Sequence, residues 1–427
     1  MRNKNESVRK NPKNLYKRAP KLRFAEFRSA EEWEVKSLSD ISLRITEKVG
    51  NIILPTVSIS AGIGFVLQTE KFGRDISGEQ YKNYIVLNNG EFSYNKGNSK
   101  KYPQGCIYKL VNFKQVAAPN AFISFKMHDG YISDFFRLYF EANYHGEQLK
   151  KFITSGARSD GLLNISPDDF FTLKFPSPKK SEQQKIADCF SSLDDLIAAH
   201  MKTLEVLKAY KKGMMQRLFP AEGETAPKLR FLEFRDEPKW EEKPLSAVSD
   251  INPVINQLPE RFVYIDLESV ISGRLLFKKR INRVSAPSRA QRLLRNGDVI
   301  FQMVRPYQRN NLLCHFDDGY DYVASTGYAQ LRPFGSSKYL FQLIHTDPFV
   351  EKVLAKCTGS SYPAIRSSDL AEIIIMIPAL SEQQKVADSL SSLDDLISAQ
   401  SAKIDALKEH KKGLMQQLFP SPDEASQ

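Results

Sequence analysis

The sequence predicts an α+β protein in which two mixed α/β domains are separated by two long antiparallel helices and related by a pseudo-two-fold internal repeat. The first observation behind this prediction is that residues 181–220 and 381–420 align without a gap and are identical at 25 of 40 positions. The second is that the segment Ala-Pro-Lys-Leu-Arg-Phe at 19–24 returns at 226–231. The third is the length of 427 residues, which exceeds that of one ordinary domain.

The composition is that of a globular protein, with 41% hydrophobic and 26% charged residues. No apolar run approaches 18 residues, and no apolar stretch follows the charges of the first 23 residues, so we expect neither a membrane span nor a secretory signal. The four cysteines form no C-x-x-C pair, which disfavours a disulfide framework and a zinc site. These features favour a cytoplasmic protein that contacts no membrane.

The repeated segments fix the predicted domain boundaries. Between them, two variable segments share little residue-by-residue similarity but have the same order of features: a short β-type stretch, a helical stretch, a Gly-Ser turn and an apolar strand ending in proline. These features lie at 122–127, 131–152, 155–156 and 170–176, and again at 298–304, 337–356, 358–361 and 372–378. The predicted division is a basic flexible tail at 1–18, a domain at 19–180, a helix at 181–219, a linker at 220–228, a domain at 229–380, a helix at 381–419 and a tail at 420–427.

Each repeated 40-residue segment reads as a single helix. Ser181 or Ser381 is placed to cap the N-terminus, with a glutamine three residues later in the capping-box position. Pro220 or Pro420 ends the helix, because proline cannot continue it. Such a helix is about 58 Å long at the usual rise per residue.

Apolar residues with a 3-4 spacing form a heptad seam along each helix, over about five heptads. Two copies of one apolar seam are most simply buried against each other. We therefore expect the seam residues to join the two helices, or to join them to partners. These residues are Ile186, Leu193, Ile197, His200, Leu204 and Leu207 in the first copy, and Leu393, Ile397, Gln400, Ile404 and Leu407 in the second.

Polar residues interrupt the seam at the same places in both copies. His200 corresponds to Gln400, and Lys211 corresponds to Lys411. In an antiparallel pair we expect His200 and Gln400 to occupy neighbouring layers, on the order of 10 Å apart. The aspartate pairs at 194–195 and 394–395 lie outside the seam, and we expect them to be solvated or to face a partner rather than to act as catalytic acids.

The net charge of +11 is concentrated in two segments. Residues 1–23 hold nine basic residues and one acid, residues 274–309 hold ten basic residues and one acid, and the remainder is net negative. A smaller acid-free patch of lysines and tyrosines lies at 93–114. Clustered cations beside aromatic and amide side chains suit a surface that follows phosphates and reads bases. The alternative is a solubilising tail together with a solvated face.

The repeated segments resemble a known family. The P-K-L-R-F…W-E segments, the S-E-Q-Q-K-I-A-D…S-L-D-D-L-I helix and its K-K-G-x-M-Q-x-L-F-P end are similar to the specificity subunit of Type I restriction–modification enzymes. The resemblance covers essentially the whole chain beyond the basic tail, and it includes the doubled arrangement. It implies two target-recognition domains, each of which reads one half of a split double-stranded DNA target.

The resemblance also implies partners and a division of labour. The helices would space the two domains and dock two methyltransferase subunits, and restriction/translocase subunits would join that core. S-adenosylmethionine, ATP and Mg would belong to the partner subunits, so we expect no cofactor in this chain. The sequence agrees in having no phosphate-binding loop, no dinucleotide fingerprint and no amino-methyltransferase segment such as N-P-P-F.

The expected role is therefore a non-catalytic DNA reader. One alternative is a freestanding architectural or repressor-like DNA-binding protein whose helices serve self-association. Another is a recognition subunit of a different restriction type.

Candidate DNA contacts are the polar, cationic and aromatic side chains of the basic loops. Arg, Gln and Asn are able to form paired hydrogen bonds with base edges, whereas the cations at 279–283 suit phosphates. In the first domain the candidates are Tyr94, Asn95, Lys96, Asn98, Lys100, Lys101, Tyr102 and Gln104; in the second they are Lys279, Arg280, Arg283, Arg305, Tyr307, Gln308, Arg309 and Asn310.

Overall fold

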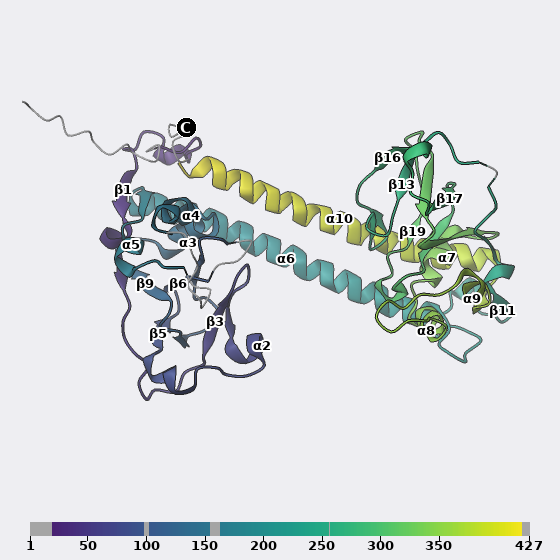
Figure 1. The fold of residues 1–427 in the computed structure, drawn as a ribbon, viewed down its shortest axis with the longest axis horizontal. Helices are drawn as coiled ribbons and strands as arrows, with labels where there is room; N and C mark the ends of the chain where they lie inside the picture. The colour runs from purple at the N-terminus through teal and green to yellow at the C-terminus, as the bar shows by residue number, and fades with distance from the viewer. Residues whose placement is uncertain (1–18, 98–101, 154–162, 256, 421–427) are drawn as a thin grey trace, which may run out of the picture. The chain divides into compact units, whose positions relative to one another are not determined.

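The chain divides into two compact units, and each long helix contributes one half to each of them. Unit 1 comprises Met1–Ala199 with Ile404–Gln427, and unit 2 comprises His200–Lys403. The predicted division treated the helices as segments of their own, whereas here each half packs into the core of a unit. The elements are labelled on the computed structural model in Figure 1. The residues described are 19–97, 102–153, 163–255 and 257–420.

Unit 1 is a set of small antiparallel sheets with short helices. Strand β1 (Glu34–Ser37) pairs with β10 (Lys174–Ser177), which joins the start of the domain to its end. The central four-stranded sheet has the order β2-β9-β6-β7, and β3 pairs with β4 and β5 with β8. The other bounds are β2 (Ser42–Arg44), β3 (Val57–Ser60), β4 (Gly64–Leu67), β5 (Ile85–Asn88), β6 (Phe92–Asn95), β7 (Cys106–Lys109), β8 (Gln115–Ala118), β9 (Ile123–Met127), α1 (Leu38–Ile41), α2 (Gln68–Phe72), α3 (Ser133–Glu141), α4 (Tyr144–Leu149) and α5 (Pro167–Phe171).

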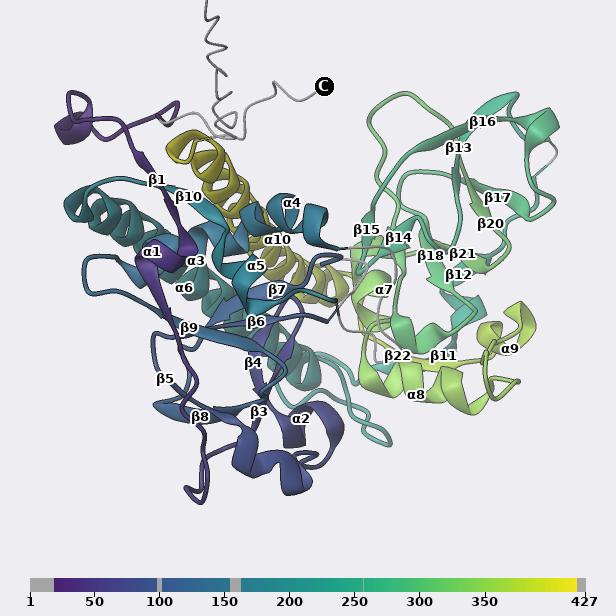
Figure 2. The same ribbon diagram turned by 60° about the vertical axis from the view of Figure 1, so that its left-hand side comes forward.

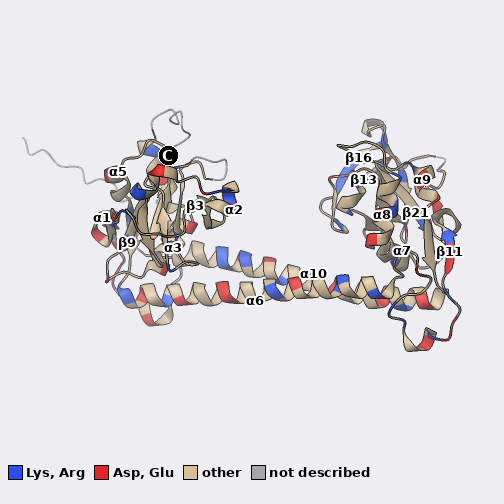
Figure 3. Ribbon diagram, turned by 90° about the horizontal axis from the view of Figure 1, so that it is seen from below, with Lys and Arg blue, Asp and Glu red and all other residues tan. Residues whose placement is uncertain are grey.

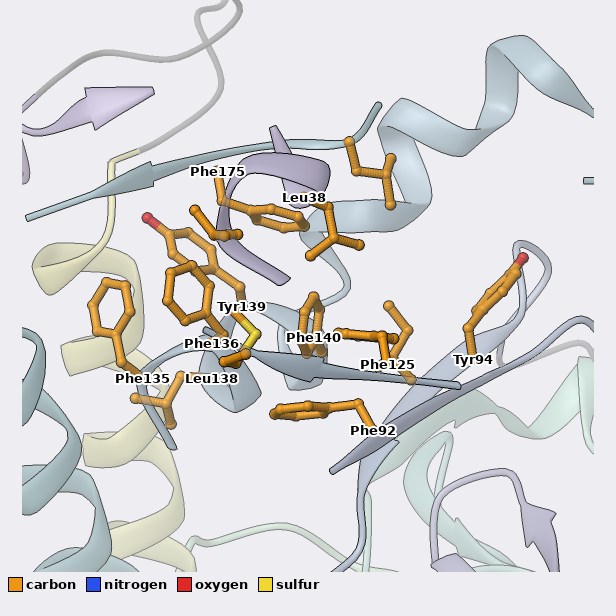
Figure 4. Close-up of a cluster of buried hydrophobic side chains, with 14 of the residues drawn as sticks. Leu38, Phe92, Tyr94, Phe125, Phe135, Phe136, Leu138, Tyr139, Phe140 and Phe175 are labelled. Carbon is orange, nitrogen blue, oxygen red and sulfur yellow. The ribbon is translucent and has the colours of Figure 1, made fainter. Parts of the chain in front are cut away.

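The core of unit 1 consists largely of aromatic rings. Phe92 on β6 stacks on Phe125 on β9 at a centroid distance of 5.2 Å, and Phe140 on α3 meets the Phe92 ring edge-on at 5.3 Å. Figure 4 shows these rings between α3 and the strands. Such pairs add to the free energy gained by burying their area. They hold rigid the sheet that carries the β6–β7 connection.

Unit 2 has a similar set of elements with a larger second sheet. Strand β11 (Glu241–Pro244) pairs with β22 (Ile374–Ile377), as β1 does with β10. One four-stranded sheet has the order β12-β21-β18-β19, and a second has the order β16-β13-β20-β17, in which β13 and β20 are parallel. The other bounds are β12 (Ser249–Ile251), β13 (Arg261–Ile265), β14 (Val270–Ile271), β15 (Arg274–Leu275), β16 (Lys279–Asn282), β17 (Ala290–Leu294), β18 (Val299–Gln302), β19 (Leu312–Leu313), β20 (Tyr322–Ser325), β21 (Tyr328–Pro333), α7 (Ser337–Leu343), α8 (Asp347–Ala355) and α9 (Ser367–Ala371).

The two units share one topology in their first four-stranded sheet. In chain order, strands β2, β6, β7 and β9 of unit 1 correspond to β12, β18, β19 and β21 of unit 2, and both sheets have the same spatial order. The predicted α+β class with an internal repeat is therefore confirmed, even though the variable segments share little sequence. Figure 2 shows the strands of each unit from a second direction.

Several predicted elements have different bounds in the structure. The predicted helix at 131–152 is interrupted because Asn143 adopts a left-handed backbone with φ of 58° between α3 and α4. The predicted helix at 337–356 is also two helices, because the Thr346 side chain accepts a hydrogen bond from the Phe349 amide and starts α8 anew. Each predicted strand ending in proline is shorter than expected and follows a short helix, α5 or α9.

The long helices α6 (Lys180–Leu218) and α10 (Leu380–Leu418) each begin one residue before the predicted start. The predicted capping box at Ser181 is wrong, because Ser181 lies inside the first turn, and the Gln184 amide donates to Asp188 instead of reaching back. The amides of Glu182 and Gln183 donate to the Lys179 carbonyl, which starts the helix. At the second helix, Gln384 likewise donates to Asp388, so the Ser381 capping box is also wrong.

The halves of α6 and α10 run antiparallel within each unit. In unit 2, His200 contacts Gln400, whereas Lys211, further along α6, contacts Asp394, which lies earlier on α10. In unit 1, Asp194 contacts Lys411 in the same sense. Figure 1 shows the teal α6 and the yellow α10 side by side. The antiparallel pairing predicted from the repeated seam is therefore present.

The polar interruptions of the seam pair with one another more closely than expected. The Gln400 Nε2 atom lies 2.9 Å from His200 Nδ1 and donates to the His200 carbonyl at 2.8 Å, so the expected separation of about 10 Å was too large. The two polar residues meet because the long glutamine side chain reaches the histidine on the other helix. Lys211 Nζ binds Asp394 at 2.6 Å, and Lys411 Nζ binds Asp194 at 2.5 Å.

These ion pairs correct the prediction for Asp194 and Asp394. Both carboxylates were expected to be solvated or to face a partner, but each accepts from a lysine of the other helix. Each also binds its own domain, through Arg137 in unit 1 and Gln342 in unit 2.

Within the described ranges, no helix combines the length and the apolar character that a membrane span requires.

Candidate nucleic-acid interface

The two candidate reading loops occupy the same connection in the two units. In unit 1 the candidates lie at the end of β6 and in its connection to β7, and in unit 2 the candidates at 305–310 lie between β18 and β19. These strand pairs correspond in the two four-stranded sheets. In each unit, a backbone hydrogen bond from a later segment holds the first residue after the strand. Leu163 N donates to Lys96 O at 3.0 Å, and Ile365 N donates to Met303 O at 3.1 Å.

Two of the candidates in unit 1 belong to the interior. Tyr94 is fully buried and stacks on Phe170 at 4.8 Å, and its hydroxyl donates to the Gln104 carbonyl at 2.7 Å. Burial raises the pKa of the Tyr94 hydroxyl, so it remains protonated. Gln104 is itself buried. The prediction that Tyr94 and Gln104 contact DNA is therefore wrong for this conformation; Figure 4 shows Tyr94 among the core residues.

The remaining unit 1 candidates lie at the ends of the loop. The Asn95 side-chain oxygen accepts from Gly97 N at 2.9 Å, while Lys96 and Tyr102 are half-buried. Gly105 closes the loop with φ of 78°, and a Cβ there would lie 2.5 Å from the Asn95 carbonyl, so only glycine fits. Asn98, Lys100 and Lys101 lie outside the described residues.

The candidate loop in unit 2 is held by an internal network of amides. Gln302 on β18 donates through Nε2 to the Gln308 side-chain oxygen at 2.9 Å, and its own Oε1 accepts from the Asn310 amide at 3.2 Å. The side-chain oxygen of Asn310 accepts from Ser272 N. These contacts show that Gln308 and Asn310 shape the loop.

The Arg309 guanidinium is bound by two other residues of unit 2. Its Nη1 donates to the His345 carbonyl at 2.9 Å, and its Nη2 binds the Asp347 carboxylate at 2.6 Å. The guanidinium lowers the pKa of Asp347, which keeps the pair ionised. Arg309 therefore anchors the loop to α8, and its predicted contact with DNA would compete with this pair.

Tyr307 and Gln308 are the exposed candidates of the loop, and Arg305 is half-buried. Tyr307 is 50% exposed on the short 3-10 helix η7 (Pro306–Gln308). The Arg305 guanidinium lies 4.2 Å from the centre of the Tyr362 ring, which is 64% exposed. Sequence reasoning missed Tyr362, although its position beside a Gly-Ser turn is a weak signal of a loop.

The phosphate candidates lie on and after β16, at the edge of the second sheet. Lys279 and Arg280 are exposed, and the Arg280 guanidinium lies 3.8 Å from the centre of the exposed Tyr320 ring. Arg283 is half-buried and donates to the Leu258 carbonyl at 2.9 Å. Figure 3 colours the Lys and Arg residues of this edge blue.

A neighbouring lysine on this edge is already paired with a carboxylate. Lys278 binds Asp318 at 2.6 Å and, with the Tyr322 hydroxyl, lowers the pKa of Asp318 to about 2. Lys279 and Arg280 form no ion pair among the residues that the structure describes, so their charges face outward. Across those same residues, no group of three or more His, Cys, Asp or Glu side chains is arranged to hold a metal ion.

The duplicated sheet topology and the paired helices define the class of the fold, a two-domain protein built on repeated helices. Comparison with known families then identifies it further: a model described as the Type I restriction modification DNA specificity domain matches residues 30–209 and 294–409. These ranges make up more than half of the chain, which therefore belongs to this family.

Individual relatives are distant in sequence. The Type I restriction enzyme MjaVIII specificity subunit of Methanocaldococcus jannaschii is 26% identical over 295 residues, which cover 65% of this chain and 68% of the relative. The putative type I restriction enzyme MjaX specificity subunit of the same organism is 24% identical and covers 91% of this chain and 93% of its own.

Solved structures share the fold at low identity. The Type I restriction–modification system S subunit from M. genitalium has a TM-score of 0.56 at 14% identity, covering 95% of this chain and all of its own. A chain from work on complex assembly and conformational transition of the type I R-M system has a TM-score of 0.53 at 16% identity, covering 91% of this chain and 97% of its own.

Proposed function

We propose that this chain is the DNA sequence-recognition subunit of a Type I restriction–modification complex, in which each domain reads one half of a bipartite, asymmetric target. The observation that carries the proposal is the shared position of the two candidate loops. Two loops with different sequences occupy the same connection of the same sheet. A repeated scaffold with different loops suits a target whose two halves differ.

The chemistry of the loops supports DNA as the ligand. The loop and edge residues of unit 2 combine outward cations, exposed aromatic rings and a rigid amide network. Cations on a sheet edge suit phosphates, and a rigid loop bearing arginine suits base edges. Membership of the specificity family supports the same assignment.

The helices are proposed to space the domains and to dock two methyltransferase subunits, with restriction/translocase subunits joining that core. S-adenosylmethionine, ATP and Mg would then be bound by those partners, and the chain would have no catalytic activity alone. Two exposed leucines at corresponding places of the repeat, Leu196 at 44% and Leu396 at 54%, are available for such docking.

A domain exchange in the native host tests the proposal. Residues 242–379 are replaced by the equivalent segment of a relative with another target, and methylated sites are mapped across the genome. We expect one half of the target to change and the other to stay. If both halves of the target changed together, the proposal would be contradicted. Methylation that persists unchanged after deletion of the whole chain would also contradict it.

A further inference from the structure

A second loop supports the reading loop of unit 2 and shares its outer surface. This loop, residues 358–363, contains the Gly-Ser turn. Isolated β-bridges join Ala364 to Val304 and to Thr358, and Arg305 N donates to the Pro363 carbonyl at 2.7 Å. The backbone of Arg305 is therefore fixed by the second loop rather than by its own strand.

The backbone at Arg305 is also held in a conformation that arginine rarely adopts. Arg305 and Arg309 both have φ of 55°, one on each side of η7. Non-glycine residues in this region cost of the order of 1–3 kcal/mol each and persist only where the surroundings impose them. Here the Pro363 carbonyl holds Arg305, and Asp347 with the His345 carbonyl holds Arg309. From this backbone position the Arg305 side chain lies against Tyr362.

The Arg305 side chain is oriented but not neutralised. Its guanidinium lies over the Tyr362 ring, and the Nε atom is buried without a hydrogen-bond partner. In the part of the chain that the structure describes, no carboxylate forms an ion pair with Arg305. Arg309, four residues away, is by contrast fully engaged by a carboxylate and a carbonyl.

We propose that Arg305 reads a guanine within the half-target of unit 2, and that Tyr362 is the positioning residue that aims it. The inference rests on the proposed function and adds to it the residue that sets specificity. The two Nη groups are the atoms available to donate to guanine O6 and N7, since Nε is buried. An arginine stacked on an aromatic ring loses little further freedom on binding, so its hydrogen bonds favour one geometry.

The same geometry separates Arg305 from the phosphate contacts. Lys279 is exposed on a sheet edge, and a flexible ammonium group on such an edge accepts many phosphate positions. Arg305 is half-buried, and its planar group lies over the Tyr362 ring. Loss of Lys279 should therefore weaken binding to all sequences, whereas loss of Arg305 should relax one base position.

Four variants in the native host test the inference, with methylated sites mapped across the genome. Arg305→Lys keeps the charge but loses the planar fork, and we expect it to lose about 10- to 100-fold discrimination at one G·C pair of the unit 2 half-target. Tyr362→Ala should relax the same pair, and Tyr362→Phe should preserve it because the ring remains. Lys279→Gln is the matched control, and it should lower methylation at every site without changing the motif.

The outcomes separate this inference from the proposed function. Each of three outcomes would overturn the inference. The first is an unchanged motif in Arg305→Lys, and the second is relaxation at a pair other than G·C or in the other half-target. The third is relaxation at different positions in Arg305→Lys and Tyr362→Ala. In all three cases the domain exchange would still report on the proposed function. Thermal unfolding of the purified variants checks the fold, and for Arg305→Lys we expect a midpoint equal to that of the parent chain.

Discussion

At the scale of single residues, two buried carboxylates show what the repeated Pro-Lys-Leu-Arg-Phe segment does. Arg23 binds Glu182 through Nε and Nη2 at 2.7 and 2.6 Å, and Arg230 binds Glu382 in the same way at 2.9 and 2.7 Å. Glu182 and Glu382 are only 2% and 1% exposed. Each segment therefore fastens a domain to the first turn of a long helix. Sequence comparison found the repeat, but the partner of each arginine depends on the fold.

Removal of one partner should destabilise unit 2 strongly. Arg230→Ala leaves the Glu382 carboxylate buried without a counter-charge, and we expect it to lower the free energy of unfolding by about 3 kcal/mol. Lys385→Ala is the matched control, because the Lys385–Glu233 pair is half exposed on both sides and screened by water. Chemical denaturation of the full chain measures both. Equal, small effects for the two variants would show that the buried pair does not stabilise the unit.

His345 should make the stability of unit 2 depend on pH. Burial lowers its pKa from 6.5 to about 4, and the neutral ring lies within 2.6 Å of the Phe341 carbonyl through Nδ1. The unfolded chain therefore binds a proton that the folded unit does not, and stability falls as pH drops from about 6.5 towards 4. His345→Gln should reduce this slope in denaturation series at different pH, whereas substitution of the exposed His315 should not. A slope unaffected by His345→Gln would contradict the assignment.

At the scale of elements, the seam was predictable and its register was not. The 3-4 spacing of apolar residues is visible in the sequence, and together with the flanking serine and proline it predicted the ends of both helices to within one residue. The pairing of Lys211 with Asp394 depends instead on how far one helix is displaced along the other, which periodicity leaves open. The strand order was equally out of reach, because the two variable segments form the same sheet with little common sequence.

The His200–Gln400 contact gives a test of the helix pairing. His200→Leu alone removes a side-chain partner of the Gln400 amide, so we expect lower stability. The double replacement of His200 and Gln400 by leucine buries an apolar pair, and should raise the unfolding midpoint by about 2–4 °C. It should also reduce specific methylation, since a polar contact no longer favours one register. A double variant less stable than the single one would contradict this account.

At the scale of the whole molecule, the candidate interface was only partly predictable. Charge clustering singled out the β18–β19 loop in unit 2 as a candidate, but it did not separate Arg305, which lies over the Tyr362 ring, from Arg309, which is engaged by Asp347. Composition likewise placed Tyr94 in the reading loop of unit 1, although it belongs to the core. Which side of a strand or loop a residue faces depends on contacts with distant segments, and these are not visible in a local pattern.

The chain connectivity of the two units makes a last prediction. In unit 1, Leu22 N donates to the Gln417 carbonyl at the end of α10; in unit 2, Leu229 N donates to the Arg217 carbonyl at the end of α6. The repeated segment thus begins beside a helix end in both units. In unit 2, residues 221–225 join the end of α6 directly to the repeated segment. In unit 1, the end of α10 and the repeated segment are far apart along the chain.

A circular permutant should therefore fold. The permuted chain would begin at residue 226 and end at residue 220. Residue 420 would be joined to residue 19 by a copy of residues 221–225, so the chain break would move from unit 1 to unit 2. Because every contact within each unit is kept, we expect an unfolding midpoint within a few degrees of the unpermuted chain 19–420, and the same methylated target in the host. A permutant opened inside β18 is the control, since it cuts a central strand of a sheet. If the permutant opened at 221–225 failed to fold like that control, the equivalence of the two junctions would be wrong.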